Sequence, residues 1–263
     1  MSRQLQPILY HYFSRPVPYA QTWDLQELIH RLQLQLQQSS NHPDVLLLLQ
    51  HRPTYTAGRR QTDSDLSLRD DRTRLQNIGA DFVTASRGGQ LTYHGPGQLI
   101  GYPLIDLSRF NPTMGARDYV SRIQKLLQIH LLKSHAIQHS PSEHAGVFLD
   151  RTKKIGSIGV QIRHRLTSHG FSLNITREPL SWFDQIVACG LTDVKAVSVE
   201  SELQKPVDIN EEVSKIVETF GDIFERSMVK LDLKSGGEIS EAILALENHA
   251  TQAGDWQKAP RVT

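Results

Sequence analysis

Residues 87–103 read RGGQLTYHGPGQLIGYP, a glycine-rich run that leads directly into an apolar segment. Glycine has no Cβ, so its backbone N–H groups can turn outward and approach a ligand closely. A run of such groups favours an anionic or carbonyl oxygen. Two plain turns between strands would also explain the glycines, but they would not need Arg87, Thr92 and His94. The run therefore indicates a ligand-facing loop.

The flanking segments predict that this loop joins two strands. DFVTAS (81–86) is expected as the strand that enters it, and QLIGYPLIDL (98–107) as the strand that leaves it. A Walker loop would need a closing Lys–Ser/Thr pair, which is missing here. A dinucleotide fingerprint would need a helix after the glycines. Neither nucleotide-binding motif fits.

Outward from this loop, strands and helices follow without a regular βα alternation. Runs rich in apolar residues predict strands over 5–13, 45–51, 146–150, 154–164 and 169–175. Helical spacing predicts helices over 24–36, 115–132, 208–224 and 238–248. Asp24 with Glu27, and Asp208 with Glu211, resemble capping pairs. Residues 53–60 are expected to form a polar loop, and 61–80 to be irregular or weakly helical. This order favours an α+β fold over a doubly wound sheet.

Composition excludes several classes of protein. The 263 residues include 29 basic and 28 acidic ones, so charge gives no reason to expect nucleic acid or an anionic membrane as partner. The longest apolar run, VLLLL at 45–49, is far shorter than the roughly 18 residues of a membrane span. A single cysteine, Cys189, cannot form an internal disulfide, which indicates a reducing compartment.

The glycine-rich run resembles the signature of the lipoyl(octanoyl) transferases, which belong to the biotin/lipoate protein ligase superfamily. Further blocks that resemble this family follow in its order: HRPTYTAGRR (51–60), KIGSIGV (154–160), SHGFSLNI (168–175) and FDQIVACGL (183–191). The resemblance implies one α+β catalytic domain over residues 1–235, with a mixed central sheet flanked by helices. Residues 236–263 are expected to form a C-terminal helix and a flexible tail.

Cys189 and Lys154 are the expected catalytic residues. By itself a lone cysteine is more often a small buried apolar residue than a nucleophile. Gly190 follows it directly and leaves the sulfur approachable. A thiol must ionise before it attacks, so it needs a neighbouring cation. Lys154 alone would be read as a solvated hairpin residue, but the resemblance places it on the lysine that partners the cysteine. An ammonium there favours the thiolate, and the same lysine can move protons.

The resemblance implies a two-step acyl transfer. Cys189 takes an octanoyl group from octanoyl-acyl carrier protein, and a lysine of a lipoyl-domain protein then attacks the new thioester. The implied acceptors are 2-oxoacid dehydrogenase acyltransferase subunits and the glycine cleavage H protein. Thioester exchange is nearly neutral in energy and amide formation is downhill, so no ATP and no cofactor are expected. No metal is expected either, because no histidine pair has zincin spacing.

Three segments are implied to border the acyl pocket, and their backbone N–H groups are the expected oxyanion donors. The implied substrate-binding residues are Arg87, Gly88, Gly89, Gln90, Leu91, Thr92, Tyr93 and His94, then Ser157, Ile158 and Gly159, and finally Gly170, Phe171 and Ser172. His94 is expected to face the ligand. His169 is either a ligand-facing donor or a structural hydrogen-bonding residue. The side chains of Tyr93 and Tyr102 are expected to pack.

Alternatives stay open at this point. An ATP-dependent lipoate-protein ligase would share the fold and the glycine loop but would not need a cysteine. A cysteine hydrolase would need a histidine base beside the thiol, and a binding module without activity would tolerate loss of Cys189 or Lys154. YTAGRR and FDQIVACGL lean toward the eukaryotic forms and hence toward mitochondria, with the bacterial cytoplasm as the alternative. The acid-poor start before Asp24 suits a transit peptide or a first strand equally well.

Overall fold

The computed structural model describes residues 5–37, 41–59 and 66–261, and its central strand is β2 (Asp44–Leu49). The side chains of the VLLLL run are fully buried. Successive side chains of a strand face opposite sides of the sheet. Accordingly, Leu46 and Leu48 belong to one core cluster, while Val45, Leu47 and Leu49 belong to another. The sheet therefore carries an apolar layer on each face.

The main sheet is mixed, with the strand order β10-β8-β9-β6-β2-β1-β11 and β7 paired to β8. β1 runs parallel to both β2 and β11, and β10 runs parallel to β8. The pairs β2–β6, β6–β9, β8–β9 and β7–β8 are antiparallel. The bounds are β1 (Ile8–Tyr12), β6 (Gln98–Leu104), β7 (Val147–Phe148), β8 (Lys153–Arg163), β9 (Leu166–Asn174), β10 (Lys195–Ala196) and β11 (Met228–Lys230). The predicted α+β class with a mixed central sheet is confirmed.

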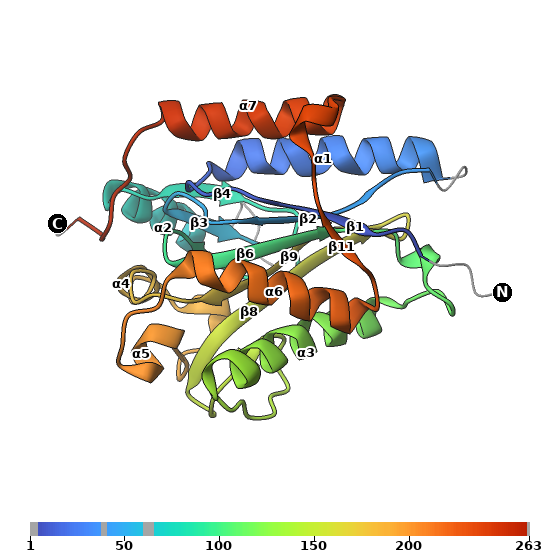
Figure 1. Cartoon of the computed structure of the whole chain (residues 1–263). Helices are drawn as coiled ribbons and strands as arrows, with labels where there is room; N and C mark the ends of the chain where they lie inside the picture. The colour runs from blue at the N-terminus through green and yellow to red at the C-terminus, as the bar shows by residue number, and fades with distance from the viewer. Residues whose placement is uncertain (1–4, 38–40, 60–65, 262–263) are drawn as a thin grey trace.

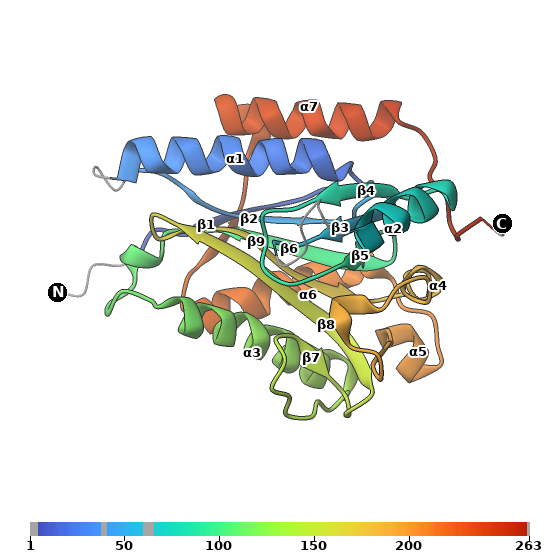
Figure 2. The ribbon, with the colours of Figure 1, turned by 180° about the vertical axis from the view of Figure 1, so that it is seen from behind.

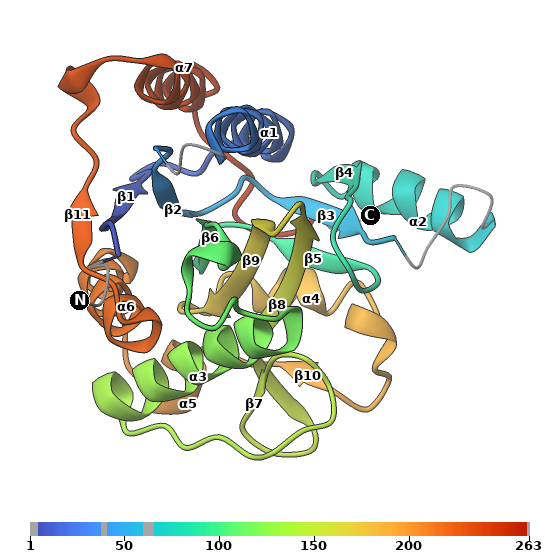
Figure 3. The same ribbon diagram turned by 90° about the vertical axis from the view of Figure 1, so that its right-hand side faces the viewer.

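Helices cover both faces of this sheet, as Figures 1 and 2 show from opposite sides. α1 (Tyr19–Leu36) and α7 (Glu238–Gln252) lie on one face. α3 (Ala116–His135), α5 (Val199–Leu203) and α6 (Ile209–Phe224) lie on the other, which is clearest in the end-on view of Figure 3. Among the described residues, no helix combines the length and the apolar character that crossing a bilayer requires.

The two predicted caps have different outcomes. α6 begins after Asp208, whose side chain accepts a hydrogen bond from the N–H of Asn210, so Asp208 is confirmed as the N-cap. The part assigned to Glu211 in this pair stays a prediction. The cap at Asp24 is wrong, because α1 already begins at Tyr19. Pro18 precedes that residue with φ −65°, and its fixed φ and missing N–H suit the start of a helix. Asp24 therefore lies inside α1.

A second, three-stranded sheet has the order β4-β3-β5 and lies beside the main one. It consists of β3 (Thr54–Ala57), β4 (Asp81–Thr84) and β5 (Thr92–His94), and α2 (Leu66–Asn77) and α4 (Leu180–Phe183) lie near it. The loop predicted over 53–60 is thus wrong for residues 54–57, while residue 60 lies outside the described residues. The Tyr55 hydroxyl donates to the Trp182 carbonyl at 2.7 Å, which lets a polar sequence form a buried strand.

The C-terminal segment packs on the catalytic part of the chain. α7 includes the helix that was predicted over 238–248. Its residues Ile243, Leu246 and Ala250 belong to the core cluster beneath α1. After α7, the Arg261 N–H donates to the Ile78 carbonyl at 2.9 Å, so the segment expected as a flexible tail makes a defined contact. The division of the chain at residue 235 stays a prediction.

A buried carboxylate holds the edge of the main sheet together. Asp44, which is fully buried at the start of β2, forms ion pairs with Arg226 at 3.0 Å and Arg109 at 3.2 Å. Its other oxygen accepts the N–H of Asp106 at 3.0 Å. Arg226 lies two residues before β11, so the carboxylate joins segments that lie far apart in sequence. Removing one partner of a buried pair leaves a charge without compensation.

We expect Arg226→Ala to lower the free energy of unfolding by about 3 kcal/mol or more, because Asp44 loses one of its two cations. Urea denaturation of the full chain measures this change. Arg117→Ala is the control, since Arg117 is an exposed residue of α3. It should change stability by no more than about 0.5 kcal/mol. Equal effects of the two substitutions would contradict the assigned role of the ion pair.

Candidate active site

Cys189 lies in a short 3-10 turn (Ala188–Gly190) between α4 and β10, in a backbone conformation that side-chain-bearing residues rarely adopt. Its φ is +57°, in the left-handed region. The Cys189 N–H donates to the Leu91 carbonyl at 2.9 Å, so the glycine-rich run itself holds this turn. Gly190 also has a positive φ of +70°, and a Cβ there would lie 2.1 Å from the Gln90 side-chain oxygen. A side chain at this position would strain the backbone and displace the end of the Gln90 side chain, so glycine is favoured after this cysteine.

Lys154 reaches the sulfur from the second residue of β8. Its Nζ lies 3.5 Å from the Cys189 Sγ and 5.4 Å from the centroid of the Phe148 ring. The side chain is largely buried. A Cβ at Gly146 would lie 2.9 Å from the Lys154 Cε and 2.6 Å from the Gly156 carbonyl oxygen, so the glycine leaves room for the lysine stem. The structure therefore brings the two predicted catalytic residues into contact.

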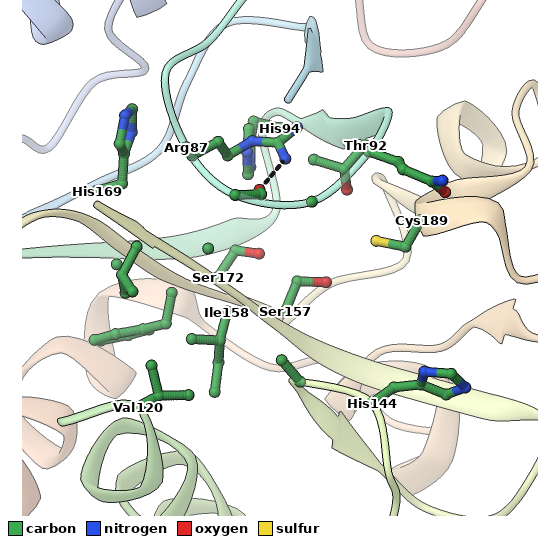
Figure 4. Close-up of a pocket in the computed structure, with 18 of the residues that line it drawn as sticks. Arg87, Thr92, His94, Val120, His144, Ser157, Ile158, His169, Ser172 and Cys189 are labelled. Carbon is green, nitrogen blue, oxygen red and sulfur yellow. Dashed lines mark hydrogen bonds between the residues drawn. The ribbon is translucent and has the colours of Figure 1, made fainter. Parts of the chain in front are cut away.

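A cavity of about 490 Å³ opens in front of this pair. Twelve of the fourteen predicted binding residues line it, together with Cys189, Lys154 and His169 (Figure 4). The twelve are Arg87, Gly88, Gly89, Gln90, Thr92, His94, Ser157, Ile158, Gly159, Gly170, Phe171 and Ser172. The glycine-rich loop, β8 and β9 thus border one cavity. They carry the three segments that were predicted to meet at the acyl pocket.

Leu91 and Tyr93 do not line the cavity, because alternate residues around β5 face the opposite side. Both are buried in the core cluster of the small sheet. Tyr93 stacks on Trp182 with the ring centroids 5.4 Å apart, and burial raises the pKa of its hydroxyl. Tyr93 therefore packs, as expected for its side chain. Leu91 contributes its carbonyl to Cys189 instead of a side chain to the ligand.

Several lining residues were not predicted from the sequence. Tyr102, expected to pack, also borders the cavity, and so do Tyr19, Val120, Glu143, Ala145, His144, Val160 and Leu191. Val120 comes from α3 and forms an apolar wall with Ile158 and Phe171. No local motif marks these residues. Tyr19 and Val120 reach the cavity through the packing of α1 and α3 on the sheet, and the others come from strands and loops around it.

Arg87 places a buried positive charge in the cavity wall. Its guanidinium donates to the Thr56 carbonyl at 2.6 Å and to the Gly88 carbonyl at 3.0 Å. Within the described part of the chain, no carboxylate pairs with it. Burial lowers the pKa of Arg87, while the nearby Tyr19, Cys189 and Tyr102 groups oppose that shift when ionised. The wall therefore favours negative charge in the cavity.

The buried histidines near the cavity are neutral. Burial, helped by the charge of Arg87, lowers the pKa of His169 to about 3. Burial also lowers the pKa of His94 well below its usual value, and its Nδ1 lies 2.8 Å from the Gln98 side-chain oxygen. The His169 ring stacks on Trp23 at 4.6 Å, and its Nε2 lies 3.3 Å from the Ser86 hydroxyl. His169 thus makes structural contacts at the cavity edge.

The three backbone N–H groups at the nucleophile are already bonded. The N–H groups of Cys189, Gly190 and Leu191 donate to Leu91, Val187 and Ala188, respectively. In Figure 4, the side chains of Thr92, Ser157 and Ser172 point into the space beside the sulfur. Donors for an acyl oxygen must therefore come from across the cavity, from the glycine loop or from these hydroxyls.

Comparison with known proteins agrees with this geometry. The model of the lipoyl protein ligase A/B catalytic domain matches residues 18–221. The mitochondrial octanoyl-[acyl-carrier-protein]:protein N-octanoyltransferase of Danio rerio is 37% identical over 73% of this chain and 83% of its own. An octanoyltransferase of Dictyoglomus thermophilum is 32% identical over 90% of this chain and 96% of its own.

Solved structures show the same fold at low sequence identity. A bi-partite lipoate protein ligase from Thermoplasma acidophilum has a TM-score of 0.62 at 14% identity, covering 95% of this chain and 93% of its own. Lipoate-protein ligase A with bound ATP has a TM-score of 0.57 at 14% identity, covering 96% and 95%. The family match spans most of the chain and includes the Cys189 loop. The protein therefore belongs to the lipoyl protein ligase A/B catalytic domain family.

Proposed function

We propose that this acyltransferase moves an octanoyl group from octanoyl-acyl carrier protein to a lysine of a lipoyl domain, through a thioester on Cys189. The observation that carries the proposal is the 3.5 Å contact between the Cys189 Sγ and the Lys154 Nζ at the mouth of the cavity. An ammonium at this distance favours the thiolate form of a thiol. The relatives named octanoyltransferase support the acyl group that we assign.

In the first step, the Cys189 thiolate attacks the thioester carbonyl of the carrier protein. The carbon–sulfur bond to the carrier then breaks, the Lys154 ammonium gives its proton to the leaving thiolate, and the acyl group stays on Cys189. In the second step, the acceptor lysine amine attacks the enzyme thioester, and Lys154, now neutral, takes the proton that the amine loses. The carbon–sulfur bond to Cys189 breaks, which leaves the amide product and restores the thiolate beside an ammonium. Val120, Ile158 and Phe171 offer an apolar wall for the chain. Every bond made or broken involves groups that the two substrates and this chain supply.

The tetrahedral intermediate of each step needs donors for its oxygen. Because the N–H groups at 189–191 are already bonded, we assign this role to the glycine loop and to the Thr92 hydroxyl. Thr92 follows Leu91 directly, and the Leu91 carbonyl holds Cys189, so the hydroxyl and the sulfur share one support. This arrangement keeps the donor at a fixed distance from the nucleophile.

The alternatives differ in what they require. An ATP-dependent lipoate-protein ligase can have this fold, since lipoate-protein ligase A with bound ATP has it. A reaction of that kind would give the Cys189–Lys154 pair no role. A cysteine hydrolase needs a histidine base, and in the described residues no histidine hydrogen-bonds to the sulfur. Both observations favour transfer through a cysteine thioester.

The proposed acceptors are lipoyl domains such as those of 2-oxoacid dehydrogenase acyltransferase subunits and the glycine cleavage H protein. We place the reaction in mitochondria, in line with the Danio rerio relative, with the bacterial cytoplasm as the alternative that the bacterial relatives support. Fractionation of cells of the source organism, followed by immunodetection, decides between the two. Recovery outside mitochondria would remove the mitochondrial assignment.

The central prediction is an octanoyl adduct on Cys189. Incubation with octanoyl-acyl carrier protein, without ATP, should add one octanoyl group, which intact-mass and peptide mass spectrometry locate. Adding a lipoyl domain should then discharge the adduct as an amide. Cys189→Ser should abolish the adduct. An acylation that requires ATP, or that survives this substitution, would sink the mechanism.

We expect Lys154→Ala to slow alkylation of Cys189 by iodoacetamide roughly tenfold at neutral pH, because the thiolate loses its cation. Lys154→Arg should keep most of the alkylation rate but lose octanoyl transfer, since guanidinium cannot accept the amine proton. The matched control is Lys153→Ala, whose Nζ pairs with Glu202 at 3.1 Å. Equal alkylation rates in Lys154→Ala and the parent would refute the pairing.

Thr92→Val should lower the rate of Cys189 acylation by about 10² to 10³, the usual effect of removing one oxyanion donor. Alkylation by iodoacetamide forms no oxyanion, so its rate should stay unchanged. Thr92→Ser keeps the hydroxyl and should acylate at close to the parent rate. Rapid-quench acylation, measured beside alkylation, separates this role from general damage. Loss of both rates together would rule out a specific oxyanion donor.

A further inference from the structure

Away from the cavity, two histidines and a glutamate converge between α3 and α6. Both imidazoles approach the same carboxylate oxygen: the His130 Nε2 lies 2.8 Å from the Glu212 Oε2, and the His135 Nε2 lies 2.7 Å from it. The three ligand atoms all lie within 4.8 Å of one another. His130 and Glu212 are almost completely buried, and His135 is nearly so. None of the three lines the acyl cavity.

The orientation of His130 is not that of a hydrogen bond. Although its Nε2 lies only 2.8 Å from the Glu212 oxygen, neither ring nitrogen of His130 meets the geometric criteria for a hydrogen bond to any residue that the structure describes. In a hydrogen bond the N–H axis points at the acceptor. In a coordination sphere, two ligand atoms instead point at a shared third position, so the axis of each misses the other. The His135 Nε2 does hydrogen-bond to the Glu212 oxygen. His130 is therefore the imidazole without a partner, and a metal ion shared with Glu212 would give its buried Nε2 one.

We propose that His130, His135 and Glu212 form a binding site for a divalent transition-metal ion, with Zn²⁺ as the expected ion. Two imidazole nitrogens and one carboxylate oxygen are ligands that Zn²⁺ accepts, and water can complete the tetrahedron. Tetrahedral ligands stand about 3.4 Å apart at ordinary zinc–ligand distances. The observed contacts of 2.8 and 2.7 Å therefore need to open by about 0.6 to 0.7 Å when the ion binds. Spacing along one helix did not indicate this site, because Glu212 comes from α6.

Lys215 is the competitor for this carboxylate. Its Nζ lies 2.8 Å from the Glu212 Oε1, the oxygen that faces away from the imidazoles, and its side chain is 40% exposed. A metal ion and an ammonium on one carboxylate repel each other. Because Lys215 is exposed, it can swing into solvent when the metal binds. Removal of this lysine should therefore strengthen metal binding. If the cluster were only a hydrogen-bonded network, removing the lysine would not produce tighter metal binding.

The site joins the last two turns of α3 to the first turn of α6. A metal there would cross-link two helices that cover the same face of the sheet (Figure 3). Val120, the cavity-lining residue of α3, lies near the opposite end of that helix. We therefore expect the metal to raise thermal stability and to leave the chemical step unchanged.

The test uses the full chain with Cys189→Ser, which removes the thiol as a competing ligand. After treatment with a chelator, the protein is titrated with Zn²⁺ by calorimetry and with Co²⁺ by visible absorption. We expect one Zn²⁺ per chain, a higher melting temperature, and the intense Co²⁺ bands of a tetrahedral site. Glu212→Gln should weaken binding at least about 100-fold, since even outer-shell changes cost 10- to 100-fold.

Two further variants make the outcome decisive. His139→Ala removes an exposed histidine four residues after His135 and should leave affinity unchanged. Lys215→Met should tighten binding roughly tenfold, because the competing cation is gone. Equal binding by Glu212→Gln and its parent, or no binding at one equivalent, would overturn the proposal. If Glu212→Gln does not fold, Lys215→Met decides, and unchanged affinity in it overturns the site. None of these outcomes depends on the proposed acyl transfer.

Discussion

A single contact, between an ammonium nitrogen and a sulfur 3.5 Å away, sets the requirements for the site. Lys154 stands on β8, while Cys189 stands on a turn that no regular element stabilises. Besides the turn's own two hydrogen bonds, from Gly190 and Leu191, one backbone hydrogen bond joins it to the glycine-rich run, from the Cys189 N–H to the Leu91 carbonyl. Because a left-handed residue costs of order 1–2 kcal/mol, the surrounding structure must keep this turn in place. The glycine-rich run therefore does more than border the ligand.

Charge and polarity are unevenly divided across the cavity. Arg87 and Lys154 place two cations in the wall, while burial keeps His94 and His169 neutral. Val120, Ile158 and Phe171, which also line the cavity, give the apolar surface that a fatty chain needs. This arrangement suits a reaction in which negative charge forms on a sulfur and an oxygen atom while a hydrocarbon chain is bound beside them. The same cavity walls serve both steps of the proposed transfer.

The helices on the two faces of the main sheet contribute different features. On the face of α1 and α7, apolar side chains and the contact of Arg261 with Ile78 secure the C-terminal segment. On the other face, α3 contributes Val120 to the cavity near its start and two histidines to the proposed metal site near its end. One helix thus carries a substrate wall and a stabilising cluster, separated along its length. Buried polar clusters of this kind contribute only where every partner is present.

From sequence alone, the period of the apolar residues and the glycine-rich run predict the mixed sheet, most helices and the loops that meet at Cys189. Local patterns carry this information because strands and helices repeat every few residues. The strand at 54–57 was not predicted, because its polar side chains find partners only in the folded chain. The same limit hid Tyr19, Val120 and the Glu212 cluster. Distances between side chains far apart in sequence, including that of sulfur from ammonium, are set by how the layers pack, and packing has no local signature.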